Sequence, residues 1–153
     1  MTTSRLQRPT PELDSFYIVT ECYPATLRNI IKSQTLKESH VKFIGYQIAV
    51  GLKYLHSAGV VHRDLKPETI ATFADCKIKL IGFHSARSTQ PGQMTQYVVT
   101  RHYRAPELIL MNSYDHTVDV WSLGCIICEL FTGRVLLPGR DTVSQWKVRS
   151  YAL

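Results

Sequence analysis

The sequence carries a short segment whose residue types suit chemistry at a phosphate group. His62, Arg63 and Asp64 are adjacent, and Lys66 and Pro67 follow after one intervening residue. The carboxylate of Asp64 could orient a hydroxyl group and accept its proton. The cation of Lys66 could balance charge on a transferring phosphoryl group, and the guanidinium of Arg63 could pair with a phosphate. Such chemistry requires flanking elements that hold the segment in one shape.

The clearest of these elements is a helix predicted at residues 36–57, directly before the segment. Thr35 and Glu38 fit a capping box at its start, and Gly59 is a stop signal after its end. Its apolar residues fall on one helical stripe. They are Val41, Ile44, Ile48, Leu52 and Leu55. We therefore expect this helix to pack along that stripe against a core.

Shorter elements are expected on both sides of this helix and segment. Residues 15–20 (SFYIVT) are β-branched and aromatic, which predicts a buried strand, and residues 77–81 predict another. Residues 27–31 are spaced as a short helix. Residues 118–131 are apolar nearly all round, which predicts a helix buried on every side. Gly133 is expected to end that helix.

Several motifs, in order, resemble those of protein kinases. Residues 62–64 (HRD) have the form of the kinase catalytic loop, and residues 105–107 (APE) that of the motif closing the activation segment. Residues 94–104 (MTQYVVTRHYR) resemble the dual-phosphorylation segment of MAP kinases, and residues 136–141 (LLPGRD) resemble that family again. The resemblance is closest to stress-activated MAP kinases and covers about residues 15–145.

The resemblance implies roles for the residues of the site. Asp64 and Lys66 would be catalytic, and Thr95 and Tyr97 would be phosphorylated; the alternative for the latter two is that they are ordinary loop residues. Gln96 stands between them, where the family usually has Glu, Pro or Gly. Phosphates there would be paired by arginines. The expected phosphate-pairing residues are Arg63, Arg87, Arg101 and Arg104.

The resemblance also implies a nucleotide-binding hinge and two structural acids. The hinge comprises Thr20, Glu21 and Tyr23. Asp119 would accept hydrogen bonds from the catalytic-loop backbone. Glu107 would lack the arginine that pairs with its equivalent in the family, and a partly buried acid without a partner is costly.

Two motifs depart from the kinase pattern. Residues 82–84 read Gly82, Phe83 and His84 where kinases have D-F-G, and Thr69 stands where the catalytic loop ends in Asn. Both side chains that would hold magnesium are thereby replaced. The family implies ATP and Mg²⁺ as cofactors, and these losses count against Mg²⁺ binding and leave ATP binding weak or absent. No glycine-rich loop or phosphate-anchoring V-A-I-K strand occurs in the sequence.

The expected fold class is α+β and mainly α, a kinase-like carboxy-terminal lobe with a hinge strand and with the amino-terminal lobe largely missing. Residues 1–14 are expected to form a polar segment, and residues 15–153 a partial kinase domain. The chain has 18 Lys and Arg against 12 Asp and Glu, for a net charge of +6, but these charges are scattered. We therefore expect no nucleic-acid partner.

The remaining composition favours an intracellular protein. The apolar run 118–131 is shorter than the roughly 20 residues that span a bilayer, so we expect no membrane association. Cys125 and Cys128 form a C-x-x-C pair within that run and are expected to be small buried side chains rather than metal ligands. No metal site is expected, and the predicted location is the cytoplasm, with the nucleus as a second possibility.

Three functions remain open at this stage. The first is an active MAP-kinase-type enzyme acting on protein substrates. The second is a pseudokinase-type interaction module that binds kinase-pathway partners without catalysis. The third is a truncated product without a function of its own. The combined replacement at Gly82 and Thr69 favours the second and third, because both metal positions are lost together.

Overall fold

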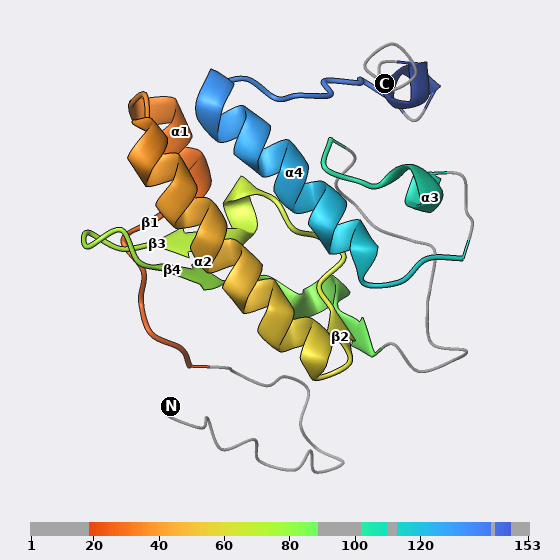
Figure 1. The fold of residues 1–153 in the computed structure, drawn as a ribbon, viewed down its shortest axis with the longest axis horizontal. Helices are drawn as coiled ribbons and strands as arrows, with labels where there is room; N and C mark the ends of the chain where they lie inside the picture. The colour runs from red at the N-terminus through yellow and green to blue at the C-terminus, as the bar shows by residue number, and fades with distance from the viewer. Residues whose placement is uncertain (1–18, 89–101, 110–112, 142, 148–153) are drawn as a thin grey trace, which may run out of the picture.

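Two long antiparallel helices form the centre of the molecule, with small strands beside them (Figure 1). The structure is a computed structural model, and it describes residues 19–88, 102–109, 113–141 and 143–147. Helix α2 (Glu38–Ser57) packs against helix α4 (Thr117–Thr132). The mixture of helices with a few short strands confirms the predicted fold class.

Helix α2 follows the predicted stripe. Val41, Ile44, Ile48 and Leu52 are buried in the core, and Leu55 is half-buried against it. The predicted capping box is wrong, since Lys37 is the N-cap residue and no side chain caps the helix there. The main-chain oxygen of Lys37 accepts hydrogen bonds from the amides of His40 and Val41. Leu36, where the helix was predicted to begin, lies before it and packs against the core.

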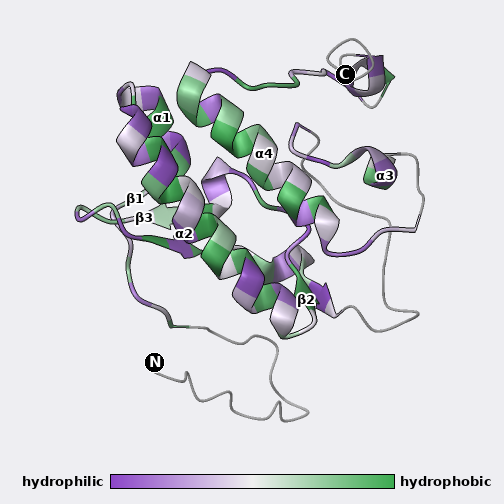
Figure 2. Ribbon diagram, viewed as in Figure 1, coloured by the Kyte–Doolittle hydropathy of each residue, from purple (hydrophilic) through white to green (hydrophobic). Residues whose placement is uncertain are grey.

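Helix α4 is buried on one side only. Its buried residues include Val118, Ser122, Cys125, Ile126 and Leu130. Val120 is 55% exposed and Phe131 is 51% exposed, so the prediction of burial on every side is wrong. Figure 2 shows α4 as hydrophobic along most of its length, whereas α2 alternates hydrophobic and hydrophilic residues. Periodicity could not separate the two faces of α4, because both faces carry apolar residues.

Glycine ends α4 as predicted. Gly133 has a φ of 70°, in the left-handed region, and its amide donates to the main-chain oxygen of Glu129. Glycine adopts this conformation without a steric penalty. Before α2 lies the short helix α1 (Leu27–Ser33), which confirms the helix expected at residues 27–31.

The strands are short, and in the chain they come before and after residues 62–66, the segment predicted to be catalytic and called the catalytic segment below. In one sheet, β1 (Ala25–Thr26), β3 (Ile70–Thr72) and β4 (Ile78–Leu80) are antiparallel in the order β1-β3-β4. In the other, β2 (Val60–Val61) pairs with β5 (Arg87–Ser88). Strand β4 confirms the strand predicted at residues 77–81. Residues 62–66 are thus anchored by β2 before them and by the 3-10 turn η1 (Pro67–Thr69) and β3 after them.

The strand predicted at residues 15–20 falls largely outside the described residues. Of its last two residues, Val19 is 83% exposed, and neither Val19 nor Thr20 belongs to a strand. The prediction is wrong for these two residues. Within the described chain, no strand pairs with this segment ahead of β1. The polar segment predicted at residues 1–14 also lies outside the described residues.

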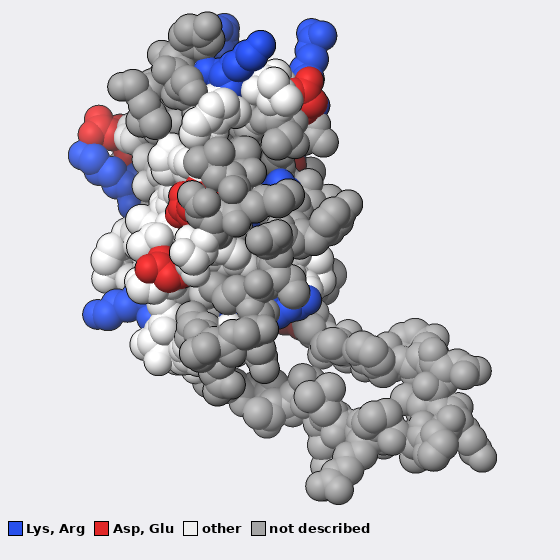
Figure 3. Space-filling view, turned by 90° about the vertical axis from the view of Figure 1, so that its right-hand side faces the viewer, with Lys and Arg blue, Asp and Glu red and all other residues white. Residues whose placement is uncertain are grey.

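Three further short elements complete the described chain. They are the 3-10 turn η2 (Phe83–Ser85), the helix α3 (Pro106–Ile109) and a helical turn at residues 143–147. No helix among the described residues is both long enough and apolar enough to cross a membrane. The four cysteines all lie within the described residues and form no disulfide there, with Cys125 buried and Cys128 half-buried. Figure 3 shows charged side chains of both signs on the face it presents, some of them next to a side chain of the opposite sign.

Candidate active site

A buried carboxylate on α4 holds the backbone of the catalytic segment. The Oδ2 atom of Asp119 accepts the amide hydrogen of His62 at 2.9 Å, and its Oδ1 atom accepts that of Arg63 at 2.9 Å. Asp119 is fully buried, and Nε2 of His56 lies 2.9 Å from the same Oδ2. Arg63 has a φ of 67°, which is unfavourable for a residue with a side chain. These charge-assisted hydrogen bonds offset that strain and fix the segment.

Asp64 and Lys66 form an ion pair inside the segment. The Nζ atom of Lys66 lies 2.8 Å from Oδ2 of Asp64, and the Asp64 side chain is only 1% exposed. The Nε2 atom of His84 approaches the same oxygen at 3.5 Å. The other oxygen, Oδ1, is buried and has no hydrogen-bond partner among the described residues. The geometry therefore brings a carboxylate and a cation together, as the sequence led us to expect for a catalytic pair.

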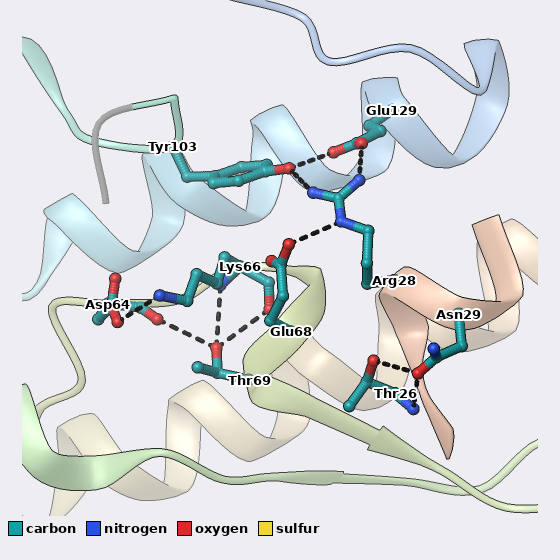
Figure 4. A network of polar contacts seen from close by, with 9 residues as sticks. All are labelled: Thr26, Arg28, Asn29, Asp64, Lys66, Glu68, Thr69, Tyr103 and Glu129. Carbon is teal, nitrogen blue, oxygen red and sulfur yellow. Dashed lines mark hydrogen bonds and ion pairs between the residues drawn. The ribbon is translucent and has the colours of Figure 1, made fainter. Parts of the chain in front are cut away.

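The hydroxyl of Thr69 braces the segment from its far end. Its single hydrogen is shared between the main-chain oxygens of Asp64 and Lys66, each 3.0 Å away, and its oxygen accepts the amide hydrogen of Lys66 at 3.0 Å (Figure 4). A hydroxyl has one hydrogen and two acceptor lone pairs. Its bonding is therefore directed into the loop backbone, and it is poorly placed to serve as an oxygen ligand for a metal.

Gly82 adopts a left-handed conformation against Thr69. Its φ is 78°, and a Cβ atom added there would lie 2.8 Å from Cγ2 of Thr69. The residue with a positive φ is therefore Gly82. His84 lies in η2 and has no positive φ. No group of three or more His, Cys, Asp or Glu side chains within the described residues could hold a metal. The residues present therefore do not fit the magnesium ions that the kinase family uses.

Arg63 and Arg87, two of the predicted phosphate-pairing residues, lie near η2. The Nε atom of Arg63 donates to the main-chain oxygen of Ser85 at 2.6 Å, and its Nη1 atom to the hydroxyl of Tyr114 at 2.7 Å. Arg87 is exposed and donates to the main-chain oxygen of Ala86. Arg104 is half-buried near the start of α3. Sequence reasoning missed Tyr114, which no local pattern marks.

The other residues of the predicted phosphorylation site are not described. Thr95, Tyr97 and Arg101 lie outside the described residues, so their pairing stays a prediction. Glu107 is half-buried in α3 and lines a cavity of about 430 Å³ with Tyr114 and Asp115. The structure shows no ion pair for Glu107 within the described residues.

The predicted hinge residues line the largest of the described cavities. Thr20, Glu21 and Tyr23 border a space of about 880 Å³. Its other walls come from β3, β4 and the residues that follow β4, as far as Gly82 and Phe83. Glu21 pairs with Lys79 of β4 across this region. The hydroxyl of Thr26, which follows these hinge residues in the chain, donates to the Asn29 side chain and so helps to cap α1.

A buried polar network behind the site was not anticipated from the sequence. The guanidinium of Arg28 donates to Glu68 at 2.7 Å, to Glu129 at 2.5 Å and to the hydroxyl of Tyr103 at 2.5 Å (Figure 4). The Tyr103 hydroxyl donates to Glu129 at 2.6 Å. The network joins α1, η1, α4 and the segment before α3. It therefore connects the catalytic segment to the start of α3.

Electrostatics support the charged form of this network. Burial alone would lower the pKa of Arg28, but hydrogen bonds to Glu68 and Glu129 outweigh it and raise that pKa. Burial and the bond to Glu129 raise the pKa of the Tyr103 hydroxyl, which keeps it a donor. The one signal in the sequence was Glu129 itself, because an acid inside an apolar helix needs a buried partner.

His62 is a buried neutral side chain within the segment. Burial lowers the pKa of its imidazole, and a hydrogen bond to the main-chain oxygen of Ile81 and the charges of Asp119 and Asp64 oppose that shift only in part. Its Nε2 atom lies 2.9 Å from that oxygen, which can only accept, so Nε2 carries the hydrogen. The ring also packs against Phe83. His62 therefore joins the catalytic segment to the residues that follow β4.

These features together define the carboxy-terminal lobe of a protein kinase: an HRD segment braced by a buried acid, a hinge-side cavity and an APE motif that begins a helix. The family model described as "Protein kinase domain" matches residues 4–151. The chain belongs to the protein kinase family, and it departs from the family pattern at Thr69, Gly82 and His84.

The chain is similar to p38-type mitogen-activated protein kinases. It is 51% identical over 138 residues to "Mitogen-activated protein kinase 14" of Xenopus laevis, a match that covers 90% of this chain and 38% of the relative. It is 51% identical over 142 residues to "Mitogen-activated protein kinase p38b" of Drosophila melanogaster, covering 90% and 39% respectively. "Mitogen-activated protein kinase p38a" of the same fly is 54% identical over 130 residues, covering 84% and 35%. The chain thus spans less than two fifths of these relatives.

Proposed function

We propose that the chain is a p38-like protein kinase lobe that keeps the framework of the catalytic segment, is impaired in phosphoryl transfer, and acts by binding proteins of a kinase pathway. The observation that carries this proposal is the state of the two metal positions. Gly82 has no side chain, and the hydroxyl of Thr69 is bonded into the loop backbone. Neither position offers the oxygen ligand that kinases use.

The expected size of the impairment follows from what the metal does. In phosphoryl transfer, bound magnesium neutralises charge that develops on the phosphate oxygens, and this contributes several kcal/mol. A loss of about 4 kcal/mol of transition-state stabilisation slows a reaction about a thousandfold. Asp64 would still orient a hydroxyl, but the single cation of Lys66 does not replace the magnesium ions that neutralise this charge in kinases.

An active MAP-kinase-type enzyme is the second candidate, and one observation favours it. Asp64 and Lys66 are paired at 2.8 Å, and Asp119 holds the backbone beside them. The general base and its cation are therefore present in an ordered segment. If they were sufficient, the chain would phosphorylate serine or threonine in a substrate even without the usual metal ligands.

Phosphoryl transfer to a proline-directed peptide distinguishes the two candidates. The assay uses radiolabelled ATP with Mg²⁺, the full chain, and the Asp64→Asn variant as the matched control, because Asn cannot accept the substrate proton. We expect no signal above that of Asp64→Asn. A signal clearly above it would establish the enzyme and overturn the proposed loss of transfer.

The interaction part of the proposal needs a separate measurement. The full chain, immobilised under native conditions, is expected to retain specific kinase-pathway proteins from a lysate. A heat-denatured sample of the same chain is the control. Retention of the same proteins by both samples, or of none by the native chain, would contradict an interaction module.

A further inference from the structure

Nitrogen groups of the protein lie against the carboxylate of Asp64, the acid that remains near the two replaced metal positions. Lys66 and His84 both approach Oδ2 of Asp64, at 2.8 Å and 3.5 Å. The second oxygen of Asp64 is buried and faces no opening. A magnesium ion bound to Oδ2 at about 2.1 Å would lie close to the Lys66 ammonium and be repelled by it. Among the described residues, the Asp64 carboxylate at this site therefore has one oxygen paired with Lys66 and the other enclosed by protein.

We propose that the cleft binds a nucleoside di- or triphosphate as a free anion, without a divalent cation, and that His84 and Lys66 supply the phosphate contacts that a metal provides in other kinases. The proposal rests on the loss of the metal ligands in the proposed function, and it goes further by assigning the ligand form and the role of His84. His84 stands where kinases have Gly, and its side chain is 63% exposed, so its ring can reach a ligand.

The position of the cavity supports this assignment. The space of about 880 Å³ runs from Thr20 and Glu21 to Gly82 and Phe83, and His84 is the next residue. A base held at the hinge end would direct its phosphates toward the end where His84 lies. The absence of a side chain at Gly82 lets a phosphate approach the backbone there closely.

The charge of the site supports the same conclusion. In a kinase with D-F-G, two acids face the phosphates, and a metal must lie between the two negative groups. Here Gly82 removes one of these acids, and Asp64 is already paired with Lys66. A phosphate at this site therefore meets a nearly neutral surface with nitrogen donors, and it needs no added cation to offset repulsion.

Calorimetric titration of the full chain with ATP and with ADP tests the proposal. One buffer contains EDTA, the other contains Mg²⁺, and the ionic strength is the same. We expect a dissociation constant in EDTA that is equal to that in Mg²⁺ within about threefold, or lower. We expect His84→Ala to weaken binding in EDTA about five- to tenfold, which matches the loss of one partly exposed charge-assisted contact.

Two further variants separate the role of His84 from a structural one. His84→Arg keeps a nitrogen donor at this position and should bind within about twofold of the parent chain. His40→Gln alters an exposed histidine on α2, away from the cleft, and should bind as the parent does. Equal affinity of His84→Ala and the parent would refute the role of His84, as would failure of His84→Arg to retain binding.

The remaining outcomes bear on this inference and on the proposed function separately. Binding that requires Mg²⁺, or no binding in either buffer, would overturn the inference. Neither result would by itself restore phosphoryl transfer. Conversely, transfer above the level of Asp64→Asn would overturn the proposed function whatever the titration shows.

Discussion

Gly82 and Thr69 are in close contact, and we therefore predict that substitutions at these two positions are coupled in their effect on the free energy of unfolding. Replacing Gly82 with Ala imposes two penalties. A side chain at a φ of 78° costs about 1–2 kcal/mol. The new Cβ would also lie 2.8 Å from Cγ2 of Thr69, and overpacking of this kind costs about 1–3 kcal/mol. We therefore expect Gly82→Ala to lower the free energy of unfolding by about 2–5 kcal/mol.

A matched control isolates the steric part of this penalty. Gly133 has a φ of 70°, but nothing lies within 4 Å of the Cβ that Ala would add there. Gly133→Ala should therefore cost only the conformational 1–2 kcal/mol or so. Any cost of Gly82→Ala beyond that of Gly133→Ala reports the contact with Thr69.

Removing the obstructing methyl group should remove that excess. Thr69→Ser deletes Cγ2 and keeps the hydroxyl that bonds to Asp64 and Lys66, at an expected cost of about 1 kcal/mol for one buried methyl. In the Thr69→Ser background, Gly82→Ala should cost about as much as Gly133→Ala. The double-mutant cycle should therefore show a coupling energy of about 1–3 kcal/mol.

Urea unfolding of the four variants and the parent chain, followed by the fluorescence of Trp121 and Trp146, measures these energies. Similar slopes with denaturant would show that the unfolded states are comparable. The reasoning would be refuted if Gly82→Ala and Gly133→Ala cost the same within about 0.5 kcal/mol. A coupling energy below that value would refute it as well.

Two further predictions concern buried charge. Arg28→Met should lower the free energy of unfolding by about 3–5 kcal/mol, because it leaves the Glu129 carboxylate buried without its cation. Adding Glu129→Leu should recover much of that loss. Urea unfolding measures both changes, and no recovery in the double variant would contradict this account. Burial lowers the pKa of His62, so below the ordinary histidine value of about 6.5 the unfolded chain binds more protons and the folded chain loses stability as pH falls. Unfolding between pH 7.5 and 5.5 should therefore show a steeper loss in the parent and in His40→Gln than in His62→Gln, and equal slopes in all three would exclude His62 as the cause.

The sequence predicted the buried face correctly where the apolar residues of an element fall on one face only. The stripe from Val41 to Leu52 falls on one face of α2, and that face is the buried one. Helix α4 was located correctly, but its exposed face could not be predicted because Val120 and Phe131 are as apolar as the residues that pack. The start of α2 was misplaced because the expected side-chain cap does not form, and Lys37 is the N-cap residue.

The site divides in the same way between local and distant contacts. Residues 62–69 lie together in the sequence, so their motif marked Asp64, Lys66 and Thr69 directly. Arg28 and Glu129 are separated by 101 positions, and no spacing rule connects positions so far apart. The sequence indicated only one member of this pair, Glu129, because it is an acid within an apolar run. Nothing in the sequence marked Arg28 as its partner.

The three departures from the kinase motifs fit one another physically. The methyl group of Thr69 occupies the space beside Gly82 that a side chain there would need. The hydroxyl of Thr69 ties together the main chain of Asp64 and Lys66. The Nε2 atom of His84 lies 3.5 Å from Oδ2 of the same Asp64. Restoring Asp at position 82 alone would bring its Cβ against the methyl group of Thr69. We therefore expect that a metal position is recovered only when residue 69 is replaced together with residue 82.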